Sequence, residues 1–110
     1  MKVLNIDEVE GDQVGAGIRK ILVHSENLML MYSEAEPGGG LSHSHPHEQM
    51  GYIIQGMTQL TAGGETVTLR AGSSFLLGPN EHHDLKVIGD EKCIVLDIFH
   101  PHREDYVPKK

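Results

Sequence analysis

The stretch His43-Ser44-His45-Pro46-His47-Glu48-Gln49 places three histidines and a glutamine close together, and a second pair, His82-His83, follows a Gly-Pro turn. Alternate side chains of an extended strand lie on one face, so His43 and His45 are expected to project the same way, about 7 Å apart along the backbone. Two imidazoles at that spacing can converge on one ion. The stretch therefore predicts a metal site rather than a solvated, histidine-rich loop.

The spacing alone leaves the choice of ligands open. His47 has the same strand parity as His45. His82 and His83 are neighbours that face opposite ways on a strand, so only one of them can enter an interior site. Imidazole nitrogen suits Zn, Cu, Ni and Fe, and oxygen donors complete the shell for Mn or Fe. The expected cofactor is therefore a divalent transition metal: Mn, Fe, Co, Ni, Cu or Zn.

Short apolar runs alternate with turn residues along the chain, and no segment shows a long helical period. Several short strands separated by turns predict an all-β barrel or sandwich. Gly63-Gly64 tolerates the positive φ angles of a tight primed turn, which predicts a hairpin at that point. The predicted strands are residues 18–23, 28–34, 50–55, 57–62, 65–70, 74–77, 83–88 and 93–99.

The length and the net charge of the chain exclude several classes of partner. A chain of 110 residues fits one domain. A net charge of −7 without a basic cluster argues against nucleic acid and anionic membranes as partners. No apolar run approaches the ~20 residues needed to cross a bilayer, and Cys93, the single cysteine, is expected to be an inert buried thiol. We expect a soluble, cytoplasmic protein that binds a small molecule.

Two of the predicted strands are apolar on both faces. If Gln49 points inward, alternation sends the residues at 51 and 53 inward and those at 50, 52 and 54 outward. Strand 93–99 behaves alike: with Asp97 inward, Ile94, Leu96 and Ile98 occupy the other face. In a chain with little helix, such a face is covered by a second sheet or by another subunit, so we expect a homodimer.

The histidine stretch resembles the first motif of the cupins, the superfamily of double-stranded β-helix proteins. That motif runs Gly, five residues, His-x-His, three or four residues, Glu, six residues, Gly. His43, His45 and Gly56 fall on its positions, but Pro37 stands in place of the first glycine and Gln49 in place of the glutamate.

The second cupin motif runs Gly, five residues, Pro-x-Gly, two residues, His. Gly72, Gly78, Asn80 and His83 fall on these positions, and the proline is displaced to Pro79. The resemblance implies a single jelly-roll domain over residues 1–110, with the first motif at about 38–56 and the second at about 72–87. By motif position it implies the metal ligands, which are His43, His45, Gln49 and His83. It leaves His47 as a neighbouring loop residue and His82 as a surface residue.

A narrower likeness extends from about residue 17 to 107. The blocks Arg19-Lys20-Ile21-Leu22, 45–49, Leu96-Asp97-Ile98-Phe99 and Arg103-Glu104-Asp105-Tyr106 are similar to the KdgF-type cupins of uronate catabolism. This likeness implies conversion of unsaturated uronate monosaccharides into linear keto forms. It also implies a glutamine among the metal ligands and an Asp-x-Phe pair, here Asp97 and Phe99, that lines the active site.

The candidate residues suit such chemistry. An amide at Gln49 leaves the charge of a divalent metal uncompensated, which favours Lewis-acid catalysis of ring opening or isomerisation. A carboxylate inside an apolar strand is costly unless it has a function, so Asp97 is expected to transfer protons and Phe99 to form a pocket wall. Arg19 either clamps a substrate carboxylate or faces solvent at a sheet edge.

Three functions are consistent with the sequence. The first is a metal-dependent enzyme that opens or isomerises an unsaturated uronate, with a small and possibly anionic sugar as its substrate. The second is a metal-dependent dioxygenase. The third is a non-catalytic module that binds a metal or a sugar acid, because a fold does not determine a function.

Overall fold

The computed structural model describes residues 1–107, so the predicted domain 1–110 extends three residues beyond the described part. Within residues 1–107 the regular structure is ten strands and two short 3-10 helices, which confirms the all-β prediction. The strands are β1 (Asp12–Val14), β2 (Gly17–His24), β3 (Met29–Ala35), β4 (Gly40–His43), β5 (Glu48–Gln55), β6 (Met57–Ala62), β7 (Glu65–Arg70), β8 (Ser74–Leu77), β9 (His83–Ile88) and β10 (Cys93–His100). The 3-10 helices are η1 (Ile6–Glu8) and η2 (Glu104–Tyr106).

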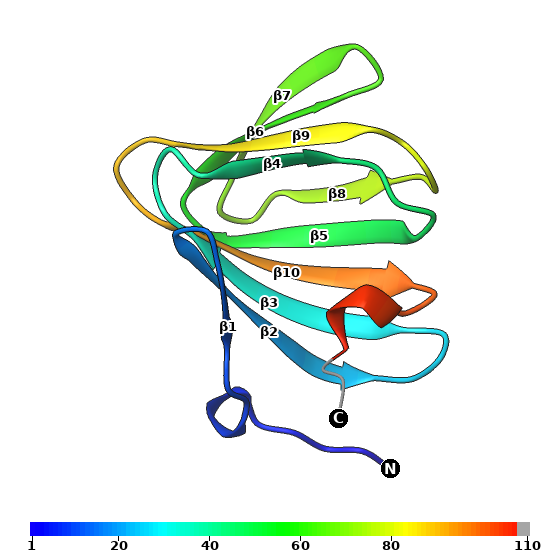
Figure 1. Ribbon diagram of the computed structural model, residues 1–110. Helices are drawn as coiled ribbons and strands as arrows, with labels where there is room; N and C mark the ends of the chain where they lie inside the picture. Colours follow the sequence, from blue (N-terminus) through cyan, green and yellow to red (C-terminus); the bar gives the residue numbers. More distant parts are fainter. Residues whose placement is uncertain (108–110) are drawn as a thin grey trace.

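The strands form two antiparallel sheets that face each other as a double-stranded β-helix (Figure 1). The larger sheet has six strands in the order β1-β2-β3-β10-β5-β8, and the smaller has four in the order β4-β9-β6-β7. Figure 1 shows η2, in red, beside the ends of β10 and β3. No helix in the described part of the chain is long and apolar enough to span a bilayer.

All eight predicted strands are present, but two short strands were missed and one expectation was wrong. β1 buries none of its three residues, so it lacks the apolar alternation that marks a strand. β4 ends at His43, and His45 lies in the loop that leads to β5 rather than in one extended strand with it. Pro46 has no N–H to donate to a ladder, which is consistent with the loop at this point.

The predicted alternation of inward and outward residues is confirmed. In β5, Gln49, Gly51 and Ile53 are buried, whereas Met50 and Tyr52 are both 49% exposed. In β10, Asp97 and Phe99 are buried, and Ile98 between them is exposed on the opposite face. The inner face of the larger sheet therefore carries the candidate site residues, and its outer face is apolar and partly exposed.

The core consists of two apolar clusters between the sheets. The larger cluster contains Ile53, Leu60, Leu69, Leu77, Val87 and Cys93. The smaller cluster, Met29, Met31 and Phe99, packs against Tyr106 and Val107 near the candidate histidines. Burial raises the pKa of the Cys93 thiol, which keeps it protonated and supports the expected inert role.

Turn chemistry fixes the register of the smaller sheet. Gly63 and Gly64 have φ angles of 60° and 77°, a left-handed conformation that glycine adopts without strain. The hairpin predicted there joins β6 to β7, with Ala62 opposite Glu65.

Candidate metal centre

Three histidines from three different segments meet between the sheets. His43 is the last residue of β4, His83 is the first residue of β9, and the two are register partners. His45 lies in the loop that follows β4. A 2.7 Å hydrogen bond from the backbone amide of Asn80 to the carbonyl of His45 joins this loop to the turn that precedes β9. One ring nitrogen of each histidine lies within 4.8 Å of the others, a spacing at which all three can bind one ion.

In His45 and His83 the other ring nitrogen is hydrogen-bonded to a backbone carbonyl, which defines the tautomer of each ring. Nδ1 of His45 donates to the His47 carbonyl at 3.0 Å, and Nδ1 of His83 donates to the Glu81 carbonyl at 2.9 Å. Both rings therefore present an Nε2 lone pair to the site. His83 Nε2 is buried and has no hydrogen-bond partner among residues 1–107, as expected of a nitrogen that binds a metal.

Gln49 contributes an oxygen to the same site. Its Nε2 donates a 3.0 Å hydrogen bond to Asp97 Oδ1, and this turns its Oε1 to within 3.0 Å of His45 Nε2. With Nδ1 of His45 protonated, Oε1 and Nε2 are both acceptors, so no proton joins them. Two buried acceptors in contact are stabilised by a cation between them, and Gln49 thus lies where the fourth predicted ligand belongs.

The electrostatic environment favours the neutral forms of His43 and His45. Burial, followed by the charges that His83 and His45 would carry, lowers the pKa of His43 to about 4. Burial and the nearby Arg103 guanidinium lower the pKa of His45. Neutral imidazole is the form that binds metals. Three imidazoles and an amide oxygen therefore fit a divalent transition metal, and the donor set does not distinguish among the six metals expected.

Asp97 lies directly behind Gln49. It is 5% exposed, and burial raises its pKa to about 6, although the hydrogen bond from Gln49 acts in the opposite direction. Its register partners are Met31 on β3 and Gly51 on β5, and the ring of Phe75 lies over Gly51. A carboxyl group with a pKa near neutrality can both accept and donate a proton, and proton transfer by Asp97 stays a prediction.

Phe99 separates the histidines from the C-terminal segment. Its ring meets His45 edge-on, with centroids 5.7 Å apart, and meets Tyr106 in the same way at 6.1 Å. It is 1% exposed, so it forms an apolar wall between these rings, in agreement with its predicted position.

Asp97, Phe99 and Arg19 all line one cavity of about 350 Å³ between the sheets, together with His43 and Gln49. The Arg19 guanidinium lies 3.9 Å from the centroid of the Tyr106 ring. Of the two positions expected for Arg19, the structure has the one that faces the cavity.

The other two histidines of the motif stretches, His47 and His82, lie outside the cluster. His82 is exposed and contacts Ser42 Oγ at 3.1 Å and Asp84 Oδ1 at 3.6 Å on the outer surface. His47 packs beside His45 and Phe99, with ring centroids 5.4 and 6.4 Å away, and does not join the three converging nitrogens.

Two side chains of the site were not assigned a role from the sequence. Arg103 is 5% exposed, and Asp105 accepts two hydrogen bonds from it, at 3.0 Å from Nε and 2.7 Å from Nη2. The guanidinium of Arg103 lies 3.8 Å from the centroid of the Tyr106 ring and 5.2 Å from the centroid of the Phe99 ring. The tail that carries these residues shows no periodic pattern, and the only signal was the likeness of its Arg-Glu-Asp-Tyr block to the KdgF-type cupins.

Two facing antiparallel sheets with an inward histidine triad define a small cupin. Residues 31–99 match the family described as Cupin domain, and the chain belongs to this family. More particularly, it is 31% identical over 104 residues to the pectin degradation protein KdgF of Dickeya dadantii (strain 3937). The matched residues cover 92% of this chain and 94% of the relative. The resemblance inferred from the sequence motifs is thereby confirmed.

Two solved structures show the same architecture. The structure of KdgF from Halomonas sp. superposes with a TM-score of 0.88 at 25% identity, covering 97% of this chain and 99% of that one. The polyketide cyclase RemF from Streptomyces resistomycificus superposes with a TM-score of 0.81 at 20% identity, covering 94% and 82% respectively. The second likeness concerns the fold alone.

Proposed function

We propose that this cupin is a metal-dependent enzyme that opens or isomerises an unsaturated uronate sugar. The observation that carries the proposal is the contact between Asp97 and Gln49, because it places a buried carboxyl group beside a candidate metal ligand in a cavity of about 350 Å³. The likeness to a pectin degradation protein supports a sugar acid as the substrate.

The chain offers a group for each part of such a reaction. We propose His43, His45, Gln49 and His83 as the metal ligands. A divalent metal held by them would act as a Lewis acid that polarises a hydroxyl or carbonyl group of the sugar.

Ring opening is an isomerisation, so its atoms balance without a co-substrate. A proton leaves the anomeric hydroxyl, the bond between the ring oxygen and the anomeric carbon breaks, and a proton is added to a ring carbon as the enol becomes a ketone. Asp97 is the group we propose to accept the first proton and to return one to carbon. Phe99 bounds the cavity beside the histidines and keeps water from the reacting atoms.

The substrate that we propose is anionic. Arg19 lines the same cavity as Asp97, and a planar guanidinium matches a carboxylate with two parallel hydrogen bonds. The carboxylate of a uronate is the part of the sugar that we expect Arg19 to bind.

A direct assay tests the reaction. Purified protein of known metal content is mixed with unsaturated galacturonate or mannuronate, and the absorbance of the conjugated double bond is followed together with dissolved oxygen. We expect absorbance to fall without oxygen consumption. Oxygen consumption would instead identify a dioxygenase, and binding without turnover would identify a non-catalytic module. His83→Ala, which removes one of the three converging nitrogens, is the control for metal dependence.

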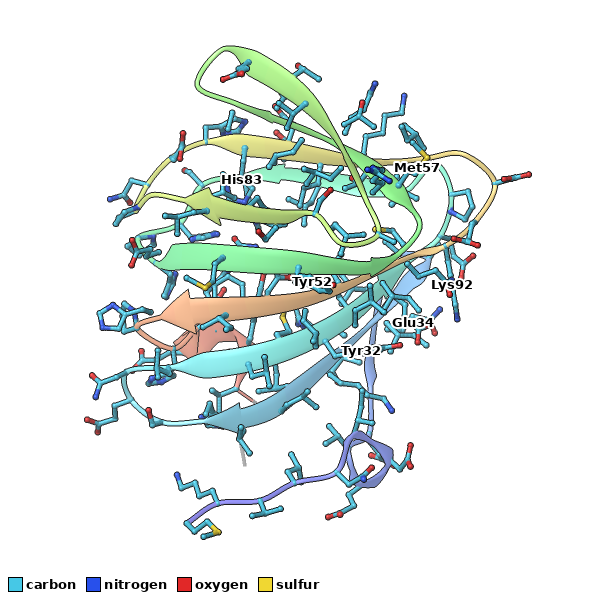
Figure 2. The ribbon with its side chains drawn as sticks, turned by 180° about the vertical axis from the view of Figure 1, so that it is seen from behind. Tyr32, Glu34, Tyr52, Met57, His83 and Lys92 are labelled. Atoms are coloured by element: carbon cyan, nitrogen blue, oxygen red, sulfur yellow. The ribbon has the colours of Figure 1, made fainter. Side chains whose placement is uncertain are left out.

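We further propose that the enzyme is a homodimer in which two copies meet through the outer face of the six-stranded sheet. Apolar side chains from four adjacent strands form this face: Leu30, Met50, Tyr52, Leu76, Leu96 and Ile98. A continuous exposed apolar surface marks an interaction site, and a two-fold axis requires a surface that complements itself. At its border the carboxylate of Glu34 is paired with Lys92 at 2.8 Å (Figure 2), so the charges there do not repel a second copy.

Sedimentation at micromolar concentration tests the dimer. Ile98 lies in the middle of the apolar face, between Leu30 and Met50, so Ile98→Lys is expected to give a monomer. Val67→Lys, on the exposed edge of the other sheet, is the matched control and is expected to stay dimeric. A wild-type monomer would contradict this proposal and leave the proposed reaction untouched. The cytoplasmic location that we propose rests on the sequence alone.

A further inference from the structure

Tyr106 lies between two arginines that are far apart in the sequence. The Cζ atoms of Arg19 and Arg103 lie 3.9 and 3.8 Å from the centroid of its ring. Two guanidinium groups this close to one centroid would overlap if they shared a face, so they lie on opposite faces. A strand of the larger sheet and the C-terminal segment thus contribute to one stack of guanidinium, aromatic ring and guanidinium.

The two guanidinium groups differ in their other partners. Arg103 is held from outside by Asp105, whose carboxylate lies against Nε and Nη2. Arg19 Nε and Arg103 Nη1 are both buried without a hydrogen-bond partner in the described part of the chain, but only Arg103 is also paired with a carboxylate there. A buried N–H group without an acceptor is unfavourable unless a ligand supplies one. The charge of Arg103 is therefore balanced by Asp105, whereas Arg19 has no carboxylate partner among residues 1–107 and can bind an anionic ligand.

The position of Arg19 indicates which anion it can receive. Arg19 and Tyr106 line the cavity that also contains His43, Gln49 and Asp97. The ring of Tyr106 packs edge-on against Phe99, which fixes the ring and with it the plane of the guanidinium stacked on it. A planar donor held at the wall of a cavity of sugar size fits a carboxylate better than a hydroxyl group.

We propose that Tyr106 is a positioning residue for substrate recognition, which holds Arg19 flat against the cavity wall so that its free N–H groups bind the carboxylate of a sugar acid. The C-terminal 3-10 helix thereby takes part in selecting acids over neutral sugars. The inference rests on the proposed function for the identity of the sugar, but it concerns recognition and not the reaction.

The test compares an acid with the corresponding neutral sugar. Binding of D-galacturonate and D-galactose to the metal-loaded protein is measured by isothermal titration calorimetry, because these sugars differ in a carboxylate against a hydroxymethyl group. Arg19→Gln is expected to weaken galacturonate binding by roughly ten- to a hundredfold, the effect of one lost charge-assisted contact. Arg70→Gln removes an exposed arginine at the end of β7 and is expected to bind galacturonate like wild type.

The variants at position 106 separate positioning from packing. Tyr106→Phe keeps the aromatic face and is expected to retain the preference for the acid. Tyr106→Leu keeps the apolar contact with Phe99 but loses the stack. It is expected to reduce galacturonate binding about as much as Arg19→Gln, with unchanged metal content and unchanged galactose binding. Because both residues act through one contact, the double variant is expected to be hardly worse than either single variant.

Any of three results would overturn the inference. The Tyr106→Leu variant could bind galacturonate as wild type does, or it could lose equal affinity for galacturonate and galactose. The losses of galacturonate affinity could also be additive in the double variant. Wild-type protein that turns over unsaturated uronate but does not bind galacturonate would overturn it as well, and leave the proposed reaction standing. Conversely, selective binding of galacturonate without turnover of any unsaturated uronate would support the subsite and contradict the reaction.

Discussion

The amide of Gln49 donates to the carboxylate of Asp97 at 3.0 Å, and this one hydrogen bond sets which atom of Gln49 faces the histidines. A carboxylate only accepts, so the amide nitrogen turns toward Asp97 and the amide oxygen toward His45. The group proposed to transfer protons and a proposed metal ligand are thus coupled, although they lie 48 residues apart in the sequence.

Gln49→Glu should lower the stability of the metal-free protein and raise its affinity for the metal. Two carboxyl groups in contact cannot both be ionised without cost, so the melting temperature of the metal-free variant is expected to fall. A carboxylate also offsets more of the charge of a bound dication than an amide does, so the rise in melting temperature on adding metal should exceed that of wild type. Calorimetry with and without Mn²⁺ or Zn²⁺ measures both. Gln59→Glu, on an exposed part of β6, should change neither, and a smaller metal-induced rise than in wild type would contradict the prediction.

Asp97→Asn should strongly reduce turnover without loss of metal. The amide can still accept the hydrogen bond from Gln49, so metal content is expected to stay close to that of wild type. Without a group that accepts and returns a proton, turnover is expected to fall by about 10²–10⁴-fold. The measurements are metal analysis and the absorbance assay. The exposed Asp90→Asn serves as control, and an active Asp97→Asn enzyme would exclude the proposed proton transfer.

His82 and His83 provide a matched pair for metal binding. His83 is 0% exposed and points its free Nε2 into the site, whereas His82 is exposed on the other face. His83→Ala is expected to weaken metal binding by roughly tenfold or more, since loss of even an outer partner of a ligand has such an effect. His82→Ala should bind as wild type does. Equal metal content in the two variants after dialysis against a chelator would mean that the three nitrogens do not form the site.

Much of the fold and of the candidate site follows from local patterns in the sequence. With Gln49 and Asp97 taken as inward, period-two alternation assigned their strand neighbours to the correct faces, because side-chain direction in a strand depends only on parity. Motif spacing selected His83 over His82. The contact between Gln49 and Asp97 was not predictable in the same way, because it depends on the register that pairs Phe99 with Gln49.

The rest of the site depends on contacts that no local pattern encodes. Arg103 and Tyr106 lie in an irregular tail, and their role comes from where that tail packs, against Phe99 and Arg19. The end of β4 at His43 was also missed, because the extended pattern assumed for the histidine stretch does not account for the loop at Pro46. The rings still converge, since the loop brings His45 back toward the centroid of His83, 5.1 Å away.

Gly51→Ala should destabilise the protein and disturb Asp97. A Cβ at this position would overlap the ring of Phe75 and lie 2.8 Å from Asp97 Oδ1. Overpacking of this kind costs roughly 1–3 kcal/mol, which urea unfolding can measure, and turnover should fall as well because the carboxyl group must move. At Gly78 a Cβ would meet only Glu81 Oε1, at 3.8 Å, so Gly78→Ala is the control. Equal stability of the two variants would show that the inner face has more room at β5 than the contacts imply.

The phenol of Tyr32 provides a pH-dependent test of the edge of the apolar outer face. Its hydrogen bond to Glu34, followed by burial and the charge of that carboxylate, raises the pKa of Tyr32 to about 12. Because the pKa in the folded state lies above the unfolded value of about 10, this phenol stabilises the fold below pH 10 and loses that contribution as the pH rises toward 12. The difference between the ultraviolet titrations of wild type and Tyr32→Phe should therefore have its midpoint near pH 12. Glu34→Gln should move that midpoint toward pH 10. The control Glu65→Gln, at the start of β7, should leave the midpoint in place. A wild-type midpoint near pH 10 would mean that the contact between Tyr32 and Glu34 does not persist in solution.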